Sequence, residues 1–263
     1  MPEYTDQTGR KLILSHKPRR IVSVVPSQSE LLADLGLEAE VIGITKFCIH
    51  PGTWFRNKTR IGGTKNLHIQ KIRSLQPDLI IANKEENLKE EIELLAKEFP
   101  VWVSDIQNLE QSLSMIKSIG NITGKEKEAE NIISYIQNEF SKLDGLNSEL
   151  GPCSYLIWKD PYMTIGGDSF INDMLQRAGF KNVFQHLQRY PEIALSDLKE
   201  CPMILLSSEP FPFKEKHVEE LKALLTQSQI LLVDGEMFSW YGSRLIKAPS
   251  YFLQLKNQIH AFP

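Results

Sequence analysis

One pattern of helices and strands occurs twice in this sequence. In each half, a helical stretch ends at a glycine followed by an apolar residue, and a strand comes next. A short helical stretch then stops before a proline and leads into a second apolar strand, as helices commonly do at these residues. The first copy passes through Gly36 and Pro77, and the second through Gly179 and Pro202. The repeat predicts an α/β protein of two Rossmann-like lobes with a ligand cleft between them.

The composition is compatible with two such lobes and excludes several other classes of protein. The chain has 263 residues, of which 41% are apolar, so each lobe can bury a core of its own. The net charge is −3 and the charges are interspersed, without the basic stripe of a nucleic-acid binder. No apolar run approaches the roughly 18 residues that span a bilayer, so we expect a soluble protein.

The cysteines and the first residues bear on the compartment. Residues 1–10 lack the basic segment, apolar stretch and cleavage site of a secretory signal, which indicates either a cytoplasmic protein or a mature or trimmed chain. Cys48, Cys153 and Cys201 are odd in number and far apart in sequence, with no Cys-x-x-Cys pair. They predict buried free thiols and neither a disulfide framework nor a zinc site.

Strands alternate with helices in both copies, which predicts parallel sheets covered on both faces. We expect strands at 20–25, 41–45, 79–82, 101–104, 155–158, 183–184, 203–206 and 230–233. We expect helices that end at Gly36 or span 69–75, 88–97, 170–178, 217–225 and 244–259. Ser27 and Glu30 have the spacing of a capping box at the start of the first helix. Pro249 should kink the last helix.

A long helix is predicted between the lobes. After a helix at 109–119, the stretch from Gly120 to Gly124 predicts a break, and Thr123 with Glu126 predicts a second capping box. Residues 125–143 contain no proline or glycine, and about 19 helical residues would span ~30 Å. Asp144-Gly145 should end this helix. We therefore expect an N-terminal lobe at 1–122, a single rigid connecting helix at 123–146 and a C-terminal lobe at 147–263.

The segments that follow the predicted strands are rich in aromatic residues. Ligands of open α/β sheets sit at the carboxyl ends of the strands, so these segments are where a site is expected. Exposed rings there suggest a large, flat, partly apolar ligand, whereas inward-facing rings would cap the core. For one ring the two readings are about equally expected, and for the whole set we favour binding. The candidates are Phe47, Trp54, Tyr162, Met163, Glu236, Trp240 and Tyr241.

No catalytic or metal-binding motif stands out. The histidines are scattered, and His50 is the one that follows a strand end on the expected cleft side. Gly62-Gly63 and Gly166-Gly167 lack the full phosphate-loop patterns and predict turns that approach the cleft or cap a helix. Glu85 and Glu86 predict a solvated helix start. We therefore expect no resident metal and no catalytic cofactor.

Three segments together resemble a known family. Arg20 to Leu31, Pro77 to Ala82 and Gly242 to Leu245 are similar to segments of the helical-backbone, or class III, substrate-binding proteins of ABC importers. The resemblance covers nearly the whole chain and is nearest to the vitamin B12 binders. It implies two lobes on one rigid helix, no enzymatic activity, and a ligand such as cobalamin, a ferric siderophore or haem. It also implies a monomer that is periplasmic or lies at the cell surface, with an ABC permease as partner.

The resemblance also implies roles for single residues. Phe47 falls where the family stacks an aromatic ring on the ligand, and Met163 and Tyr190 fall at further contact positions. Glu236 stands where an acidic residue reaches the corrin side chains. Ser27, at the first helix, and Asn83, directly after a predicted strand, complete the expected ligand-binding set.

This sequence departs from the vitamin B12 binders at several of these places. Thr64 and Asn83 stand where those proteins have tryptophans, and Trp240 stands where they have an arginine. Either the ligand differs from cobalamin or it is gripped through Trp54 and Trp240.

The expected docking positions for a permease also depart from the family. The family places one surface carboxylate on each lobe, and here the matching residues are Gln70 and Ser196, or Asp197 if the alignment shifts by one. A cytoplasmic sensor or chaperone for a cofactor is therefore a second hypothesis.

A chelatase-like enzyme on the same fold is a third hypothesis. It would have to draw on His50, Glu85, Glu86 and Glu236.

Overall fold

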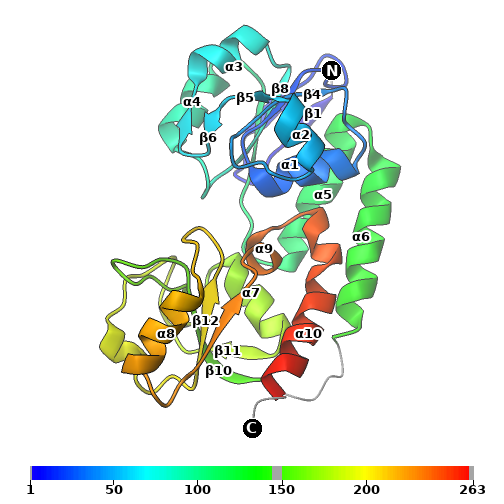
Figure 1. Cartoon of the computed structure of the whole chain (residues 1–263). Helices are drawn as coiled ribbons and strands as arrows, with labels where there is room; N and C mark the ends of the chain where they lie inside the picture. The colour runs from blue at the N-terminus through cyan, green and yellow to red at the C-terminus, as the bar shows by residue number, and fades with distance from the viewer. Residues whose placement is uncertain (1, 144–149, 261–263) are drawn as a thin grey trace. The chain divides into compact units, whose positions relative to one another are not determined.

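The structure is a computed structural model that describes residues 2–143 and 150–260. The chain divides into two compact units, each with one parallel sheet flanked by helices (Figure 1). Unit 1 comprises Met1–Ile106, Glu110–Ile136 and Tyr241–Arg244, and unit 2 comprises Gln107–Leu109, Gln137–Trp240 and Leu245–Pro263.

Unit 1 is built on a five-stranded sheet in the order β5-β4-β3-β8-β9, with every neighbouring pair parallel. The central strands β3 and β8 are buried along their whole length, as apolar runs in a covered parallel sheet are expected to be. The strands are β3 (Ile21–Ser23), β4 (Val41–Ile44), β5 (Thr59–Arg60), β8 (Leu79–Asn83) and β9 (Val101–Ser104). Two antiparallel hairpins accompany them, β1 (Glu3–Thr5) with β2 (Lys11–Ile13) and β6 (Gly62–Gly63) with β7 (Asn66–Leu67).

The helices of unit 1 follow the predicted order. They are α1 (Pro26–Asp34), α2 (Gly52–Asn57), α3 (Ile69–Leu75), α4 (Lys89–Ala96) and α5 (Leu109–Thr123), the last of which has its first residue in unit 2. The predicted capping box of α1 is wrong. The helix begins at Pro26 after Val25, with no side-chain cap, so Ser27 already lies in the first turn. Glu30 binds an arginine instead.

Unit 2 has a four-stranded sheet in the order β11-β10-β12-β13, again parallel throughout. The strands are β10 (Gly151–Leu156), β11 (Phe180–Asn182), β12 (Met203–Ser207) and β13 (Gln229–Val233). The helices are α7 (Phe170–Arg177), η1 (Leu195–Leu198), α8 (Glu215–Leu224), α9 (Glu236–Ser239), η2 (Ser243–Ile246, whose first two residues belong to unit 1) and α10 (Ala248–His260). The strand predicted at Val183-Phe184 is misplaced, because β11 has already ended at Asn182.

The two sheets confirm the repeat seen in the sequence. The order β4-β3-β8-β9 in unit 1 matches β11-β10-β12-β13 in unit 2, strand for strand. The glycines that end α1 and α7 have the same left-handed backbone, with φ of 75° at Gly36 and 93° at Gly179. Only a residue without a Cβ adopts this conformation at no steric cost, so both helices stop at the same point of the repeat.

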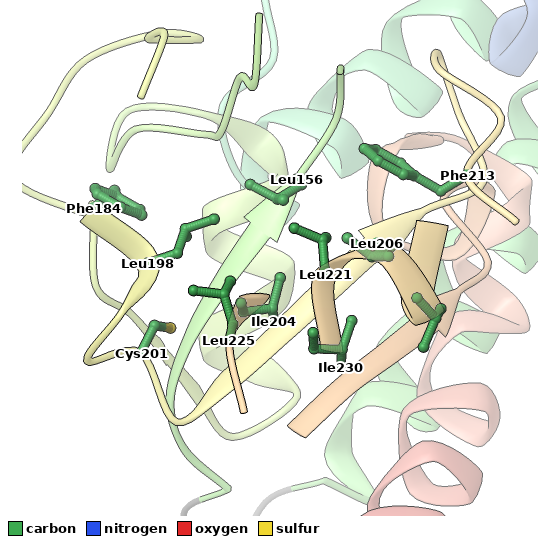
Figure 2. Close-up of a cluster of buried hydrophobic side chains, with 11 residues drawn as sticks. Leu156, Phe184, Leu198, Cys201, Ile204, Leu206, Phe213, Leu221, Leu225 and Ile230 are labelled. Atoms are coloured by element: carbon green, nitrogen blue, oxygen red, sulfur yellow. The ribbon is translucent and has the colours of Figure 1, made fainter. Parts of the chain in front are cut away.

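The core of unit 2 lies between its sheet and α8 (Figure 2). Leu221 of α8 and Leu225, directly after it, belong to one cluster with Ile204 and Leu206 of β12 and with Phe213. These side chains are 5% exposed or less. Because apolar burial stabilises by about 25 cal/mol per Å², this cluster is a principal source of stability of the unit.

The helices at the unit boundary differ from the prediction at one glycine. Gly120 does not break the helix, because α5 runs through it to Thr123 and ends at Gly124, whose φ is 70°. The boundary between the units falls within α6 (Glu126–Ser141). The expected end at Asp144-Gly145 lies outside the described residues, and the single rigid connection and the cleft stay predictions.

Gly120 is required by a close approach of α6. A Cβ at this position would lie 2.4 Å from the Cβ of Ala129 and 3.1 Å from the Lys125 carbonyl oxygen. The second capping box is also wrong, because Thr123 is the last residue of α5 and its hydroxyl donates to the Ile119 carbonyl at 2.7 Å.

Two further expectations concern the last helix and the membrane. Pro249 is the second residue of α10, where a proline is tolerated because its missing N–H has no helical partner, so the predicted kink is wrong. Within the described part of the chain, no helix is both long enough and apolar enough to cross a membrane.

Within unit 1, the segment Tyr241–Arg244 contacts helix α1. Arg244 Nε donates to Glu30 Oε2 at 2.9 Å, and both side chains are about nine-tenths buried. Gly242, with φ of 124°, brings the backbone so close that a Cβ would lie 3.3 Å from the Ser27 carbonyl oxygen. Breaking such an ion pair leaves a charge buried without its counter-ion.

We expect Gly120→Ala to lower the free energy of unfolding by about 1–3 kcal/mol, because the added methyl group overlaps Ala129. Urea denaturation measures it. Gly52→Ala is the control, since a Cβ there meets nothing closer than Arg56 Nη1 at 3.4 Å. The double variant Gly120→Ala/Ala129→Gly should recover part of the loss. A Gly120→Ala protein as stable as the parent would contradict the close approach of the helices.

We expect Arg244→Ala to destabilise the protein by about 3–5 kcal/mol, because Glu30 is left buried and charged. Arg73→Ala, which removes the exposed ion pair with Glu98, should have little effect. Adding Glu30→Gln to Arg244→Ala should restore part of the stability, as measured in the same denaturation experiment. Equal losses from both arginine variants would show that the Arg244 pair behaves as a surface contact.

Candidate functional site

In each unit, the loops of interest leave the sheet where its parallel strands end. We call this the carboxyl edge of the sheet; in unit 1 it lies at Ser23, Ile44, Asn83 and Ser104. Ligands of such sheets bind beyond this edge.

A layer of buried polar side chains lies beneath the carboxyl edge of unit 1. Asn83 Nδ2 donates to Ser104 Oγ at 3.0 Å, and the amides of Glu85 and Glu86 donate to Asn83 Oδ1 at 2.8 and 3.0 Å. Gln28 Nε2 donates to the same Ser104 hydroxyl. Asn83, expected as a ligand residue, is 2% exposed and uses its polar atoms to hold the loop after β8.

Asn87 and Cys48 extend this layer. Asn87 Nδ2 donates to the Thr64 carbonyl at 2.9 Å, which fastens the β6–β7 hairpin to the loop after β8. Cys48 Sγ lies 3.0 Å from Ser29 Oγ and 3.1 Å from Thr45 Oγ1. Burial raises the pKa of the Cys48 thiol to about 11, so it is not a nucleophile at neutral pH.

The three cysteines confirm the prediction made from their number and spacing. Cys48, Cys153 and Cys201 are free and buried. Burial also raises the pKa values of Cys153 and Cys201.

Phe47 and Trp54 follow the same strand but lie in opposite environments. The Phe47 side chain is 50% exposed at the carboxyl edge, whereas Trp54 is 1% exposed in the core. Trp54 Nε1 donates to Glu38 Oε2, and Lys58 Nζ lies 5.1 Å from its ring centroid. The structure therefore leaves Phe47 free to meet a ligand and uses Trp54 for packing.

Tyr241 reaches the same edge from the C-terminal part of the chain. Its hydroxyl donates to Glu86 Oε1 at 2.7 Å, and its side chain is 6% exposed. Burial, reinforced by the Glu86 carboxylate, raises the Tyr241 pKa far above the ordinary value, so the hydroxyl keeps its proton. Ser27 is 3% exposed in the adjacent helix α1, and His50 is partly buried after β4.

The carboxyl edge of unit 2 carries an aromatic cluster. Trp158, two residues after β10, is 40% exposed and meets Phe211 edge to face with ring centroids 5.7 Å apart. Phe211 contacts Phe213 at 4.8 Å and His217 at 5.4 Å. Tyr162 is partly buried against the core of this unit. Trp158 thus has one supported and one open side.

Met163 and Tyr190 lie in loops that pair with each other beyond the sheet. Met163 forms isolated bridges with Trp158 and Glu192, and the Thr164 amide donates to the Pro191 carbonyl at 3.0 Å. Both predicted residues are partly buried.

The glycine pair beside these loops leads into a turn before α7, as predicted. A Cβ at Gly166 would lie 2.5 Å from the Leu187 carbonyl oxygen, and Ser169 caps α7 by accepting from the Asn172 amide.

A buried carboxylate holds the loops after β12 and β13 together. Glu209 Oε1 accepts from Trp240 Nε1 at 3.0 Å and from the Ser239 hydroxyl. Burial raises the pKa of Glu209, and the nearby charges of Glu236 and Asp234 add to the shift. Trp240 is 6% exposed and donates its N–H to Glu209, so the structure places its ring in the core. Glu236 is partly exposed at the start of α9.

Sequence reasoning missed Trp158, Ile49 and Leu88 as exposed apolar side chains at the edges. Trp158 was assigned to the end of a strand, but β10 stops at Leu156. The signal that could have found it is the polar run Lys159-Asp160-Pro161 directly after it, which marks Trp158 as the start of the loop.

The expected docking residues occupy equivalent places in the repeat. Gln70 is the second residue of α3 and Ser196 the second residue of η1, and both are exposed. The neighbouring carboxylate of Asp197 accepts from the Ala194 amide at 2.9 Å and so serves its own turn.

Among residues 2–143 and 150–260, no group of three or more His, Cys, Asp and Glu side chains is arranged to hold a metal ion.

The imidazole of His217 couples the aromatic cluster to pH. Its Nδ1 accepts from the Lys214 amide at 2.9 Å at the start of α8, which requires the neutral ring. Burial lowers the His217 pKa below 6.5, and Lys159, Lys216 and Lys214 add to this while Glu220 opposes it. The folded state therefore binds this proton less well than the unfolded state.

We expect the free energy of unfolding of the parent protein to fall more steeply than that of His217→Gln as the pH drops below about 6.5. A glutamine carbonyl can still accept from the Lys214 amide but does not titrate. Above pH 7 the difference between the two proteins should be constant. Denaturation at a series of pH values measures this, and a difference that is the same at pH 5 and pH 8 would contradict it.

Comparisons with known proteins place this geometry in a family. The sequence model of the periplasmic binding protein family matches residues 21–203 of this chain. The chain is 26% identical, over 188 residues, to the uncharacterized ABC transporter substrate-binding lipoprotein YvrC of Bacillus subtilis. That match covers 67% of this chain and 59% of YvrC, so it spans less than two thirds of the relative.

Solved structures show the same fold. The periplasmic vitamin B12-binding protein BtuF of Vibrio cholerae superposes with a TM-score of 0.76 at 18% identity, covering 92% of this chain and 98% of BtuF. The periplasmic haem-binding protein HutB of Vibrio cholerae gives a TM-score of 0.75 at 19% identity, covering 93% and 99%. At these identities the likeness is one of fold. The family match covers more than half of the chain, which therefore belongs to the periplasmic binding protein family, a group of non-catalytic substrate-binding proteins of ABC transporters.

Proposed function

We propose that the protein captures a bulky metal chelate, of the corrinoid, haem or ferric-siderophore kind, and delivers it to an ABC permease outside the cytoplasm. The observation that carries this proposal is the position of the exposed apolar side chains. Phe47, Ile49, Leu88 and Trp158 are 40–50% exposed, and each follows a strand at a carboxyl edge. Large apolar side chains that are exposed at the carboxyl edge of a sheet indicate a binding surface there.

The rings stand on fixed supports, which favours binding without large rearrangement. In unit 1 the loops are held by Asn83 and Asn87, and in unit 2 by Glu209. A site whose loops are already ordered loses less conformational entropy when a ligand binds. The expectation of a ligand between the lobes extends this proposal and stays a prediction.

The family and its members support the ligand class and the location. The named relatives bind vitamin B12 or haem, and YvrC is a lipoprotein of an ABC transporter. The family is non-catalytic, which argues against the chelatase-like alternative. Gln70 and Ser196 supply no carboxylate to a permease, whereas Asp197, beside Ser196 in η1, is an exposed carboxylate.

We expect saturable quenching of tryptophan emission when the purified protein is titrated with at least one of cyanocobalamin, cobinamide, haem and a ferric hydroxamate. Trp158 should be the main reporter, because its ring is 40% exposed at the edge. Trp158→Leu should weaken binding by about tenfold, the usual effect of losing a stacking aromatic anchor.

The matched control is Tyr135→Leu, which removes a 62% exposed aromatic ring from α6, a helix that follows another helix and not a strand. It should leave the affinity unchanged. The absence of saturation with all four ligands would overturn the proposed function.

A further inference from the structure

The ammonium group of Lys46 lies over the exposed ring of Phe47 at the carboxyl edge of unit 1, in a cation–π arrangement. Its ammonium nitrogen is 5.0 Å from the ring centroid. Both residues are exposed and directly follow β4 and Thr45. A positive charge therefore borders the aromatic surface that is expected to meet a ligand.

The Gly62-Gly63 hairpin holds this pair in place. The Lys46 amide donates to the Gly62 carbonyl at 2.8 Å. A Cβ at Gly63 would lie 3.2 Å from Phe47 Cε2 and 3.5 Å from Lys46 Cε, so both side chains rest against this glycine. The next turn of the same hairpin carries Lys65, which is also exposed. The hairpin therefore supports the side chains of Lys46 and Phe47, as a recognition site requires.

Neither Lys46 nor Lys65 has a carboxylate partner within the described residues, unlike other lysines near the strand ends. Lys84 pairs with Asp105 at 2.5 Å, and Lys159 pairs with Glu220. The carboxylate of Glu91, which contacts the same hairpin, accepts from the Leu67 amide at 3.1 Å. The cations beside Phe47 are thus available to an external anion.

We propose that Phe47 and Lys46 form a subsite for a planar metal macrocycle with ionised carboxylates on its rim, which stacks on the ring and pairs a carboxylate with the ammonium group. This inference rests on the proposed function and narrows its ligand class. A macrocycle whose rim bears amides or esters leaves Lys46 without a counter-charge, whereas a carboxylate gains a charge-assisted hydrogen bond. The subsite therefore selects acidic macrocycles over neutral ones, with Lys65 adding to the field.

The experiment compares ligands that differ only in rim charge. Dissociation constants are measured for haem and haem dimethyl ester, and for dicyanocobyrinic acid and its heptamethyl ester, with the parent protein and with Lys46→Met. We expect the acid forms to bind more tightly to the parent, and Lys46→Met to weaken the acid forms by about two- to fivefold, the effect of an exposed ion pair. The esters should be unaffected, and the preference should shrink as salt is raised.

Two variants complete the design. Lys71→Met removes an exposed lysine of α3 and changes the net charge equally, so it should leave the preference intact. Lys46→Arg keeps the charge and should restore the preference. Equal binding of acids and esters, or an equal effect of Lys46→Met and Lys71→Met, would overturn the inference and leave the proposed function standing. The absence of binding by every macrocycle would overturn the inference as well, and the ferric hydroxamate titration then decides whether the proposed function survives.

Discussion

The parallel direction of all strands within each sheet is the constraint on which the candidate site depends. Parallel strands end at one edge, so every loop that leaves them there brings backbone polar groups into a partly buried region. In unit 1 the amides after β8 are satisfied by Asn83 and Asn87. In unit 2 the loops after β12 and β13 meet on Glu209. The side chains that hold each edge are buried, and those free to bind stand above them.

The repeat could be predicted from the sequence because its signals are local. Gly36 and Gly179 end helices through their own backbone conformation, whatever packs around them. Position 120 is also a glycine, but for a different reason: Ala129 of another helix approaches it closely. Likewise Ser27 and Glu30 have the spacing of a cap, yet Glu30 binds Arg244 from the far end of the chain. Such long-range contacts override local propensity and leave no mark in a single sequence.

The candidate site was predictable in its location but not in its members. Aromatic residues after strands indicated the edges, yet a ring in sequence does not reveal which way it faces. Phe47 is half exposed, whereas Trp54 and Trp240 find carboxylate acceptors for their N–H groups and are buried. An indole needs such an acceptor to be buried without cost, and the acceptors Glu38 and Glu209 lie far from their tryptophans in sequence. Burial therefore could not be assigned before the fold was known.

The two edges are equivalent in topology but differ in what they expose. The edge of unit 1 presents Phe47 with the ammonium group of Lys46 at 5.0 Å from its ring centroid, while the edge of unit 2 presents Trp158 supported by Phe211. The two halves of the repeat thus share their strand order and their helix-ending glycines but differ at the residues that face solvent. The ammonium group of Lys46 would attract an acidic ligand rim to the edge of unit 1, because complementary charge guides a ligand to the matching surface.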